Sequence, residues 1–165
     1  MKRYVIKYTS LLIITVFLIV ALPSCRNVTR TPHELMLEFK KEYKVGGVLY
    51  YSSASEGEQG YVYDGFFEAL YGDGVGSVSD FALILLSQGD TVGECAVFLA
   101  YSEYDAVLIS DMCYRRISFL ASLGISQNTE FLDGAFVLRR GEYVVMCALE
   151  DNEDAKRIWK KLIQS

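Results

Sequence analysis

The sequence predicts an α+β fold, in which a four-stranded antiparallel sheet forms one layer and helices cover one of its faces, preceded by an N-terminal helical segment. Two observations favour this fold. The second half of the chain holds two pairs of apolar, strand-length runs, and a stretch with helical periodicity follows each pair. The order strand–strand–helix–strand–strand–helix is most simply satisfied by an antiparallel sheet packed against helices.

A helix is predicted to begin directly after Thr31. Thr31 can cap its N-terminus, Pro32 takes the first helical position, and Glu34 completes a capping box. The glycine pair at 46–47 ends the helix. Apolar residues recur at helical spacing along one face of it: Leu35, Met36, Phe39 and Tyr43.

The segment that follows predicts two short extended pieces and a short helix. The extended pieces are residues 48–51 and 61–63, and the polar loop 52–60 separates them. Residues 64–71 are expected to form the helix, with its aromatic side chains directed inward. The glycine-rich stretch 72–76 then interrupts the helix.

The first strand–strand–helix unit begins after Asp80. Residues 81–87 and 94–101 are apolar runs on either side of a turn, which predicts a hairpin. Residues 104–123 are predicted to be helical and to end at Gly124. Four residues form the apolar stripe of this helix: Ile109, Cys113, Ile117 and Leu120.

The second unit repeats this order. Residues 134–139 and 142–149 are predicted to form a hairpin, and Asp151 caps the terminal helix. Lysines near the end of that helix suit the negative end of its dipole. Its inward face consists of Ala155, Ile158, Trp159 and Leu162.

The first 25 residues predict export and a lipid anchor. Three basic residues precede an apolar run from Leu11 to Leu22, and Cys25 follows shortly after that run. This order is typical of an export signal. The position of Cys25 resembles the lipobox of bacterial lipoproteins, in which the first mature cysteine carries diacylglycerol. The resemblance implies that Cys25 is the lipidated residue.

We therefore expect residues 1–24 to be a lipoprotein signal peptide, residues 25–31 a short tether, and residues 32–165 a single α+β domain. The domain would lie on the extracytoplasmic face of the cell membrane, attached through the lipid. Two alternatives remain open. The segment could stay as an uncleaved anchor if Pro23 impairs processing, or the protein could be secreted freely.

The charge balance argues against two kinds of electrostatic partner. The chain has 16 basic and 21 acidic residues, and its first 24 residues contain three of the basic residues and none of the acidic ones. The mature part is therefore more acidic than the whole chain. An acidic body argues against nucleic-acid binding and against electrostatic adhesion to an anionic membrane.

The cysteines do not predict a disulfide framework. With Cys25 lipidated, Cys95, Cys113 and Cys147 remain, and an odd set allows at most one bridge. All three lie in apolar stretches. We expect buried, unpaired thiols that behave as small hydrophobic side chains.

No motif predicts a catalytic, cofactor or metal site. His33 is the single histidine and is expected to be solvated in the first turn of its helix. The glycines of 72–76 lack the spacing and the lysine of a phosphate-binding loop. Asp64 and Glu68 could share a helical face, but two carboxylates there are more typical of a solvated surface than of a calcium site.

Two arginine pairs favour structural contacts over an anion site. One arginine of the pair 115–116 is expected to approach the sheet or to pair with an acid such as Asp111, which lies four residues before Arg115. The second pair, 139–140, lies beside a hairpin turn and is expected to be exposed.

Residues 62–163 resemble a bacterial family. Four stretches carry the resemblance: Leu70-Tyr71-Gly72, Glu94-Cys95-Ala96-Val97-Phe98, Tyr114-Arg115-Arg116-Ile117 and Gly141-Glu142-Tyr143-Val144-Val145. They are similar to domain-of-unknown-function family 4358 (DUF4358), whose members look like short lipoproteins or membrane-anchored proteins. The resemblance implies a fold and a localisation at the membrane, but it implies no activity.

The aromatic segment 43–71 is the strongest hint of a binding surface. Tyrosine combines apolar area with a polar tip, which suits recognition as well as half-buried packing. We expect any recognition of an envelope glycan, peptide or protein to involve Tyr50, Tyr51, Tyr61 and Tyr63. The sequence thus favours a non-enzymatic binding lipoprotein. The alternatives are an envelope hydrolase with an unrecognised carboxylate site and a structural or assembly subunit.

Overall fold

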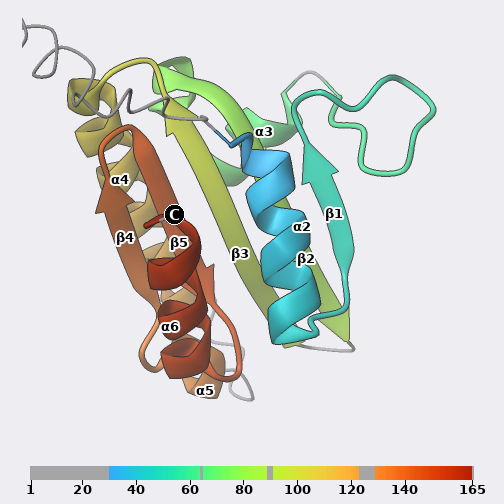
Figure 1. Cartoon of the computed structure of the whole chain (residues 1–165), viewed down its shortest axis with the longest axis vertical. Coiled ribbons are helices and arrows are strands. Elements are labelled where there is room, and N and C mark those ends of the chain that lie inside the picture. Colours follow the sequence, from blue (N-terminus) through green and yellow to red (C-terminus); the bar gives the residue numbers. More distant parts are fainter. Residues whose placement is uncertain (1–29, 64, 89–90, 123–128, 165) are drawn as a thin grey trace, which may run out of the picture.

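The computed structural model describes residues 30–63, 65–88, 91–122 and 129–164. Figure 1 shows one sheet with helices on both of its sides. The helices are α2 (Pro32–Tyr43), α3 (Phe66–Tyr71), the 3-10 turn η1 (Val75–Ser77), α4 (Glu103–Ser122), α5 (Thr129–Leu132) and α6 (Asn152–Leu162). The strands are β1 (Val48–Tyr51), β2 (Val78–Gln88), β3 (Thr91–Ala100), β4 (Phe136–Arg140) and β5 (Tyr143–Ala148).

The sheet has five antiparallel strands in the order β1-β2-β3-β5-β4, so the prediction of four strands is wrong. The fifth strand is β1, which pairs with β2 from Val48 opposite Leu85 to Tyr51 opposite Ala82. The sequence predicts that residues 48–51 are extended, but it does not predict the strand with which they pair. Residues 61–63, the other predicted extended piece, form no strand.

The prediction that helices cover only one face is also wrong. Helices α2 and α6 pack on one face of the sheet, and α3 and α4 pack on the other (Figure 1). Successive residues of a strand point to opposite faces. In β3, Cys95 and Val97 belong to the α2/α6 core, whereas Ala96 and Phe98 belong to the α3/α4 core.

The sequence contained a signal for burial of both faces. Residues 81–86, 95–100 and 143–149 are apolar without alternation. Such continuous runs are typical of strands covered on both sides, whereas a half-exposed strand alternates apolar and polar residues. The two buried cores follow from this pattern.

Helix α2 begins as predicted. The Thr31 hydroxyl accepts a hydrogen bond from the Glu34 amide at 3.2 Å, and the Glu34 carboxylate accepts one from the Thr31 amide at 2.9 Å. The helix ends at Lys44, in the left-handed region with φ of 58°. Gly47 is required after it, because a Cβ there would lie 2.6 Å from the Leu85 carbonyl oxygen.

Helix α6 also confirms its predicted cap and inward face. Asp151 accepts a hydrogen bond from the Asp154 amide at 2.9 Å. Trp159 is fully buried, its ring stacks on Phe39 of α2 at 4.7 Å, and its indole nitrogen donates to the Cys95 sulfur at 3.3 Å. Trp159 therefore joins both helices of this layer to the sheet.

No helix among the described residues is long and apolar enough to cross a membrane. The predicted signal peptide, Cys25 and most of the tether lie outside the described residues. The first described residue, Arg30, is fixed to the end of the sheet, since the Tyr143 hydroxyl donates to its carbonyl oxygen at 2.6 Å.

Candidate functional site

The four candidate tyrosines do not share one surface. Tyr50 and Tyr51 are neighbours on β1 and therefore point to opposite faces of the sheet. The ring of Tyr51 stacks on the His33 ring of α2, with ring centroids 3.9 Å apart and an interplanar angle of 4°. The ring of Tyr50 packs against Phe66 of α3 at 5.3 Å. Both tyrosines are half-buried.

Tyr63 joins Tyr50 on the α3 side. Its ring meets Phe66 edge-on at 5.5 Å, and its side chain is 61% exposed. Tyr50, Tyr63 and Phe66 thus form an aromatic cluster beside the edge strand β1. Tyr61 is also exposed, but no described ring stacks on it.

Local hydrogen bonds hold the loop between β1 and α3. The Glu58 carboxylate accepts from the Ser55 amide at 2.9 Å, and the Gly60 carbonyl accepts from the Tyr51 amide at 3.3 Å. At the start of the loop, the Ser52 amide donates to the Phe81 carbonyl at 3.1 Å. The loop therefore presents Tyr61 and Tyr63 from a backbone that is tied to the sheet.

A buried polar network, which the sequence reasoning missed, lies between the sheet and α4. Glu94 on β3 has no solvent exposure and accepts two hydrogen bonds on one oxygen from Arg116 of α4, at 3.0 Å from Nε and 2.7 Å from Nη2. Its other oxygen accepts from the Tyr71 hydroxyl at 2.6 Å. The arginine guanidinium also lies 5.9 Å from the centre of the Tyr71 ring.

The network is closed to solvent. Tyr71 and Arg116 are buried together with Glu94, and each carboxylate oxygen has a protein partner. Burial, followed by the nearby Glu94 carboxylate, raises the pKa of the Tyr71 hydroxyl well above its ordinary value. The arrangement neutralises a buried charge and ties α3, β3 and α4 together, and it offers a substrate no opening.

A signal for this network was present in the sequence. Glu94 is the single acid inside the run 94–101, and Arg116 falls on the face of α4 that carries the apolar stripe. A buried acid needs a partner. The prediction that one arginine of the pair approaches the sheet is confirmed. Among the ion pairs of the described residues there is none between Arg115 and Asp111, and Arg115 instead donates to the Asp73 carbonyl at 2.8 Å.

The other described histidine, acidic and arginine residues that the sequence singled out lie apart from this network. Among the described residues, no group of three histidine, cysteine, aspartate or glutamate side chains could hold a metal ion. His33 lies in the first turn of α2, as predicted, but it is partly covered by Tyr51. Asp64, one of the two carboxylates considered for calcium, lies outside the described residues. Arg139 and Arg140 are exposed, as predicted.

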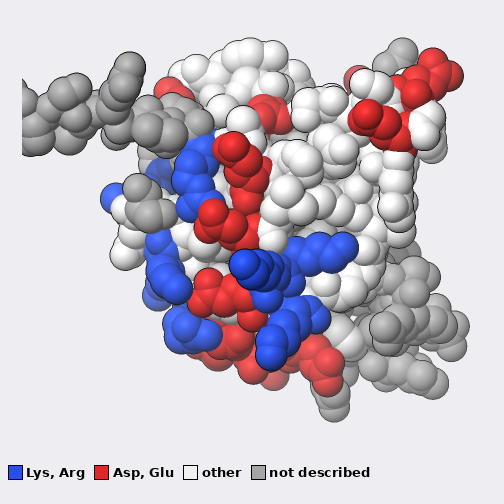
Figure 2. Space-filling model, turned by 45° about the vertical axis from the view of Figure 1, so that its right-hand side comes forward, with Lys and Arg blue, Asp and Glu red and all other residues white. Residues whose placement is uncertain are grey.

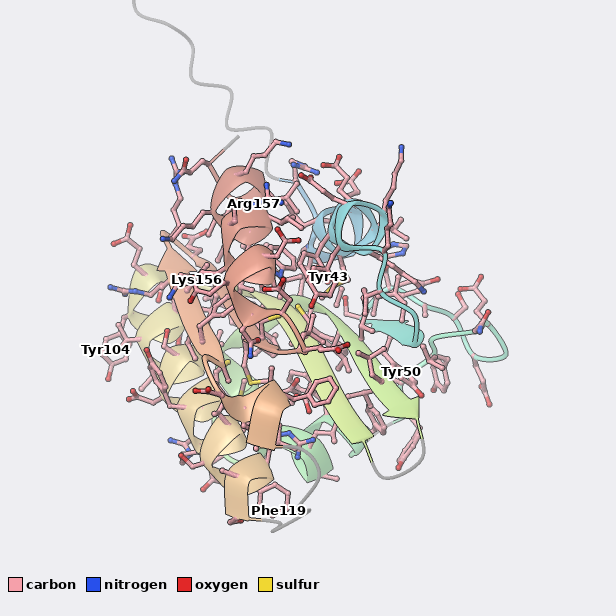
Figure 3. All side chains as sticks on the ribbon, turned by 90° about the horizontal axis from the view of Figure 1, so that it is seen from below. Tyr43, Tyr50, Tyr104, Phe119, Lys156 and Arg157 are labelled. Carbon is pink, nitrogen blue, oxygen red and sulfur yellow. The ribbon has the colours of Figure 1, made fainter. Side chains whose placement is uncertain are left out.

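The outer face of α4 is apolar and exposed. Ten large hydrophobic side chains are exposed in the described part of the chain, and six of them belong to α4 or the residues just before it. They are Tyr101, Tyr104, Val107, Leu108, Tyr114 and Phe119. Figure 3 shows Tyr104 projecting from α4 away from the sheet, and its side chain is 73% exposed. Val107 and Leu108 follow Tyr104 by three and four residues, and a rotation of about 100° per residue places Tyr114 and Phe119 on the same broad side of the helix, within a sector of about 140°.

Few charges interrupt this face. Between Tyr104 and Phe119 the exposed charged residues are Asp111 and Arg115. Arg115 is bonded to the Asp73 carbonyl, whereas Asp111 forms no ion pair within the described residues. The face thus presents one carboxylate that forms no ion pair among the described residues, and the Arg115 guanidinium one helical turn away from it.

The opposite face of the molecule differs in character. Acidic and basic side chains are interspersed over α2 and α6 (Figure 2). Lys161 of α6 bridges to Glu42 of α2 at 3.3 Å, and Arg157 bridges to Asp154 at 2.6 Å. Such a face is typical of a solvated surface.

No family model, curated protein or solved structure matches this chain.

Proposed function

We propose that this protein is a non-enzymatic, lipid-anchored binding domain of the bacterial envelope, and that it binds a protein partner through the outer face of α4. The single observation that carries the proposal is the gathering of six exposed large hydrophobic side chains on that helix and just before it. Exposed large hydrophobic side chains that gather on one side of a soluble protein, rather than being scattered singly, mark an interaction site.

The chemistry of the face defines the partner. Tyrosine and phenylalanine, which are frequent at interface centres, supply most of its area. The Asp111 carboxylate, which forms no ion pair with the described residues, would be costly to cover without a cation. The proposed occupant is therefore an apolar helical segment of a protein that places a lysine or arginine opposite Asp111.

The anchor and the face are compatible in space. Cys25 precedes Arg30 by five residues, which reach at most about 18 Å when extended. Arg30 is bound to Tyr143 at the end of the sheet where β3 finishes and α4 begins, because Leu99 pairs with Tyr143. In the proposed arrangement α4 starts near the bilayer, and its face is open to a neighbouring envelope protein.

Photocrosslinking in living cells tests the proposal. A photoreactive benzophenone amino acid is placed at Leu108, on the α4 face, and in a matched control at Leu37, an exposed leucine of α2. The expected result is one dominant adduct from position 108 that is lost when Asp111→Lys is added. The crosslinked peptide should be apolar and contain a basic residue. Equal adducts from both positions, or an adduct indifferent to Asp111→Lys, would contradict the proposal.

A second binding site is favoured by a separate observation. Tyr63 is exposed and rests edge-on against Phe66 beside Tyr50, which gives a flat, supported aromatic surface for a sugar ring or a peptide. Titration with a soluble peptidoglycan fragment checks this site. Tyr63→Ala should weaken binding about tenfold, a loss of about 1.4 kcal/mol, whereas Tyr104→Ala should leave it unchanged.

We also propose that the chain belongs to domain-of-unknown-function family 4358. The support is that Glu94, in one resembling stretch, and Arg116, in another, are ion-paired at 2.7 Å. If the resemblance holds, relatives should keep an acid and an arginine at these two positions together, because loss of either leaves a buried charge. A collection of relatives in which the two residues vary independently would contradict membership on this ground.

A further inference from the structure

Two of the three buried cysteines face each other across neighbouring strands. Cys95 of β3 and Cys147 of β5 are direct partners in the antiparallel register. Both are buried free thiols in the structure, and both belong to the α2/α6 core. Cys113 lies in the α3/α4 core, on the other side of the sheet.

The hydrogen-bond pattern of the β3–β5 ladder makes Cys95 and Cys147 a pair of the type whose side chains lie closest together. The Ala100 amide donates to the Glu142 carbonyl at 2.9 Å, so residues 100 and 142 form a hydrogen-bonded pair at the end of the β3–β5 ladder. Hydrogen-bonded and non-hydrogen-bonded pairs alternate along an antiparallel ladder. Counting inward from 100 and 142 makes Cys95 and Cys147 a non-hydrogen-bonded pair.

Such a pair has the geometry that a disulfide needs. In non-hydrogen-bonded pairs the two Cα atoms are about 4.5 Å apart and the side chains are closest. Disulfides span Cα separations of about 4.4–6.8 Å. A bridge between Cys95 and Cys147 would therefore need little movement of the backbone.

We propose that Cys95 and Cys147 are joined by a disulfide when the chain folds outside the cytoplasm. This inference rests on the export that forms part of the proposed function. The oxidant is a disulfide-bearing protein or small molecule of the envelope. One cysteine thiolate attacks its disulfide and releases the first thiol. The second cysteine then attacks the mixed disulfide, which forms the Sγ–Sγ bond and releases the second thiol, so two electrons and two protons leave the protein.

The fold fixes the time at which this exchange takes place. Both cysteines have no solvent exposure in the folded protein, and Trp159 of α6 covers Cys95. Burial raises the pKa of the Cys147 thiol well above its ordinary value, which removes the reactive thiolate. Oxidation therefore precedes the packing of α6, and the folded protein keeps the redox state in which it folded.

Refolding of the full chain in detergent tests the geometry without any assumption about export. The chain carries Cys25→Ser, is reduced and unfolded, and is then refolded in a buffer of oxidised and reduced glutathione. The expected product is about 2 Da lighter, with alkylation of Cys95 and Cys147 reduced at least tenfold relative to a fully reduced control (about 1.4 kcal/mol or more in favour of the bridge). Refolded protein whose two cysteines remain thiols would overturn the proposal.

Two variants control for the identity of the bridge. Cys113→Ala should leave the mass loss unchanged, because this cysteine lies on the other face of the sheet. Cys147→Ala should abolish the mass loss, and Cys95→Ala, an independent second variant, should do the same. A mass loss that persists in both would overturn the assignment.

Protein isolated from membranes, with thiols alkylated at lysis, tests the dependence on export. The bridge is expected there as well. A bridge that forms on refolding but is missing from the membrane-isolated protein would overturn the statement that the chain folds in an oxidising compartment and, with it, the proposed export. The geometric part of the inference would stand in that case, so the two failures are distinguishable.

Discussion

At the residue scale, stability depends on a few polar side chains that the fold buries. Glu94 is the most demanding of them, because it lies in an apolar strand with no solvent exposure. Its charge is tolerated because Arg116 supplies two hydrogen bonds and Tyr71 supplies a third. Removing one partner is more harmful than removing the whole network, since it leaves an uncompensated charge.

Arg116→Met is therefore expected to lower the free energy of unfolding by about 3–5 kcal/mol. The double variant Glu94→Leu with Arg116→Met should recover most of this loss, because it removes both charges and keeps the volume. Urea unfolding, followed by the fluorescence of Trp159, measures both. An unfolding free energy of Arg116→Met within about 0.5 kcal/mol of the wild-type value would show that the buried ion pair does not contribute this stability.

The same network predicts a pH dependence. Burial and Glu94 raise the pKa of Tyr71 in the folded protein, whereas in the unfolded chain this pKa has its ordinary value of about 10. Above that pH the unfolded state loses its proton while the folded state retains it. Stability should therefore be unaffected by this group below about pH 10 and should fall above it, by up to about 1.4 kcal/mol per pH unit.

Tyr71→Phe checks the assignment, because it removes the titrating group and keeps the ring. Its unfolding free energy should decline less steeply than that of the wild type between about pH 10 and 11. Tyr63→Phe, at an exposed position, is the control and should follow the wild type. Identical alkaline slopes for wild type and Tyr71→Phe would exclude Tyr71 as the origin.

At the scale of the elements, α6 connects the terminal part of the chain to the first helix. Trp159 stacks on Phe39 of α2, and Lys161 bridges to Glu42 on the surface. At the start of α6, Asn152 accepts from the Leu149 amide and donates to the carbonyls of Phe131 and Asp133, at 2.8–2.9 Å. The helix is thus fixed by packing along its face and by hydrogen bonds at its first residue.

Trp159→Ala is expected to cost about 3–5 kcal/mol, because it removes a fully buried large side chain and leaves a cavity between α2, α6 and the sheet. Thermal or urea unfolding followed by circular dichroism measures the loss. Lys160→Ala, on the exposed side of the same helix, should change stability by less than about 0.5 kcal/mol. In the wild type, indole emission typical of water exposure would contradict the packing.

At the scale of the whole molecule, the two helical layers have different surfaces. The α2/α6 layer is charged, with one ion pair between the two helices and one within α6, whereas the α4 layer exposes aromatic and aliphatic side chains. Under the proposed function, the charged α2/α6 layer faces water and the apolar side chains of α4 contact the partner. The proposed lipid on Cys25 would restrict the search for that partner to the membrane surface.

Metabolic labelling with an alkyne-bearing fatty acid checks the anchor. The wild type should be labelled and recovered with membranes, whereas Cys25→Ser should be unlabelled, because its first mature residue has no thiol to acylate. Cys113→Ser should be labelled like the wild type, which controls for acylation at another cysteine. Equal labelling of the wild type and Cys25→Ser would contradict the lipoprotein interpretation.

Much of the fold could be predicted from sequence because its signals are local. The capping box of α2, the two hairpins, the apolar stripe of α4 and the inward face of α6 depend on residues within about two turns of one another. The burial of Trp159 follows from the same periodicity. Each of these features was confirmed in the described residues.

The tertiary structure alone decided which distant segments meet. Nothing local pairs β1 with β2, places α2 and α4 on opposite faces, or brings Glu94 to Arg116 and Tyr71. It also packed Tyr51 against His33 of α2 and Tyr50 against Phe66 of α3, and it left the outer face of α4 uncovered within the described part of the chain. The physical reason is that burial and strand pairing depend on contacts between residues far apart in the sequence. Helix propensity and capping depend only on residues within one element.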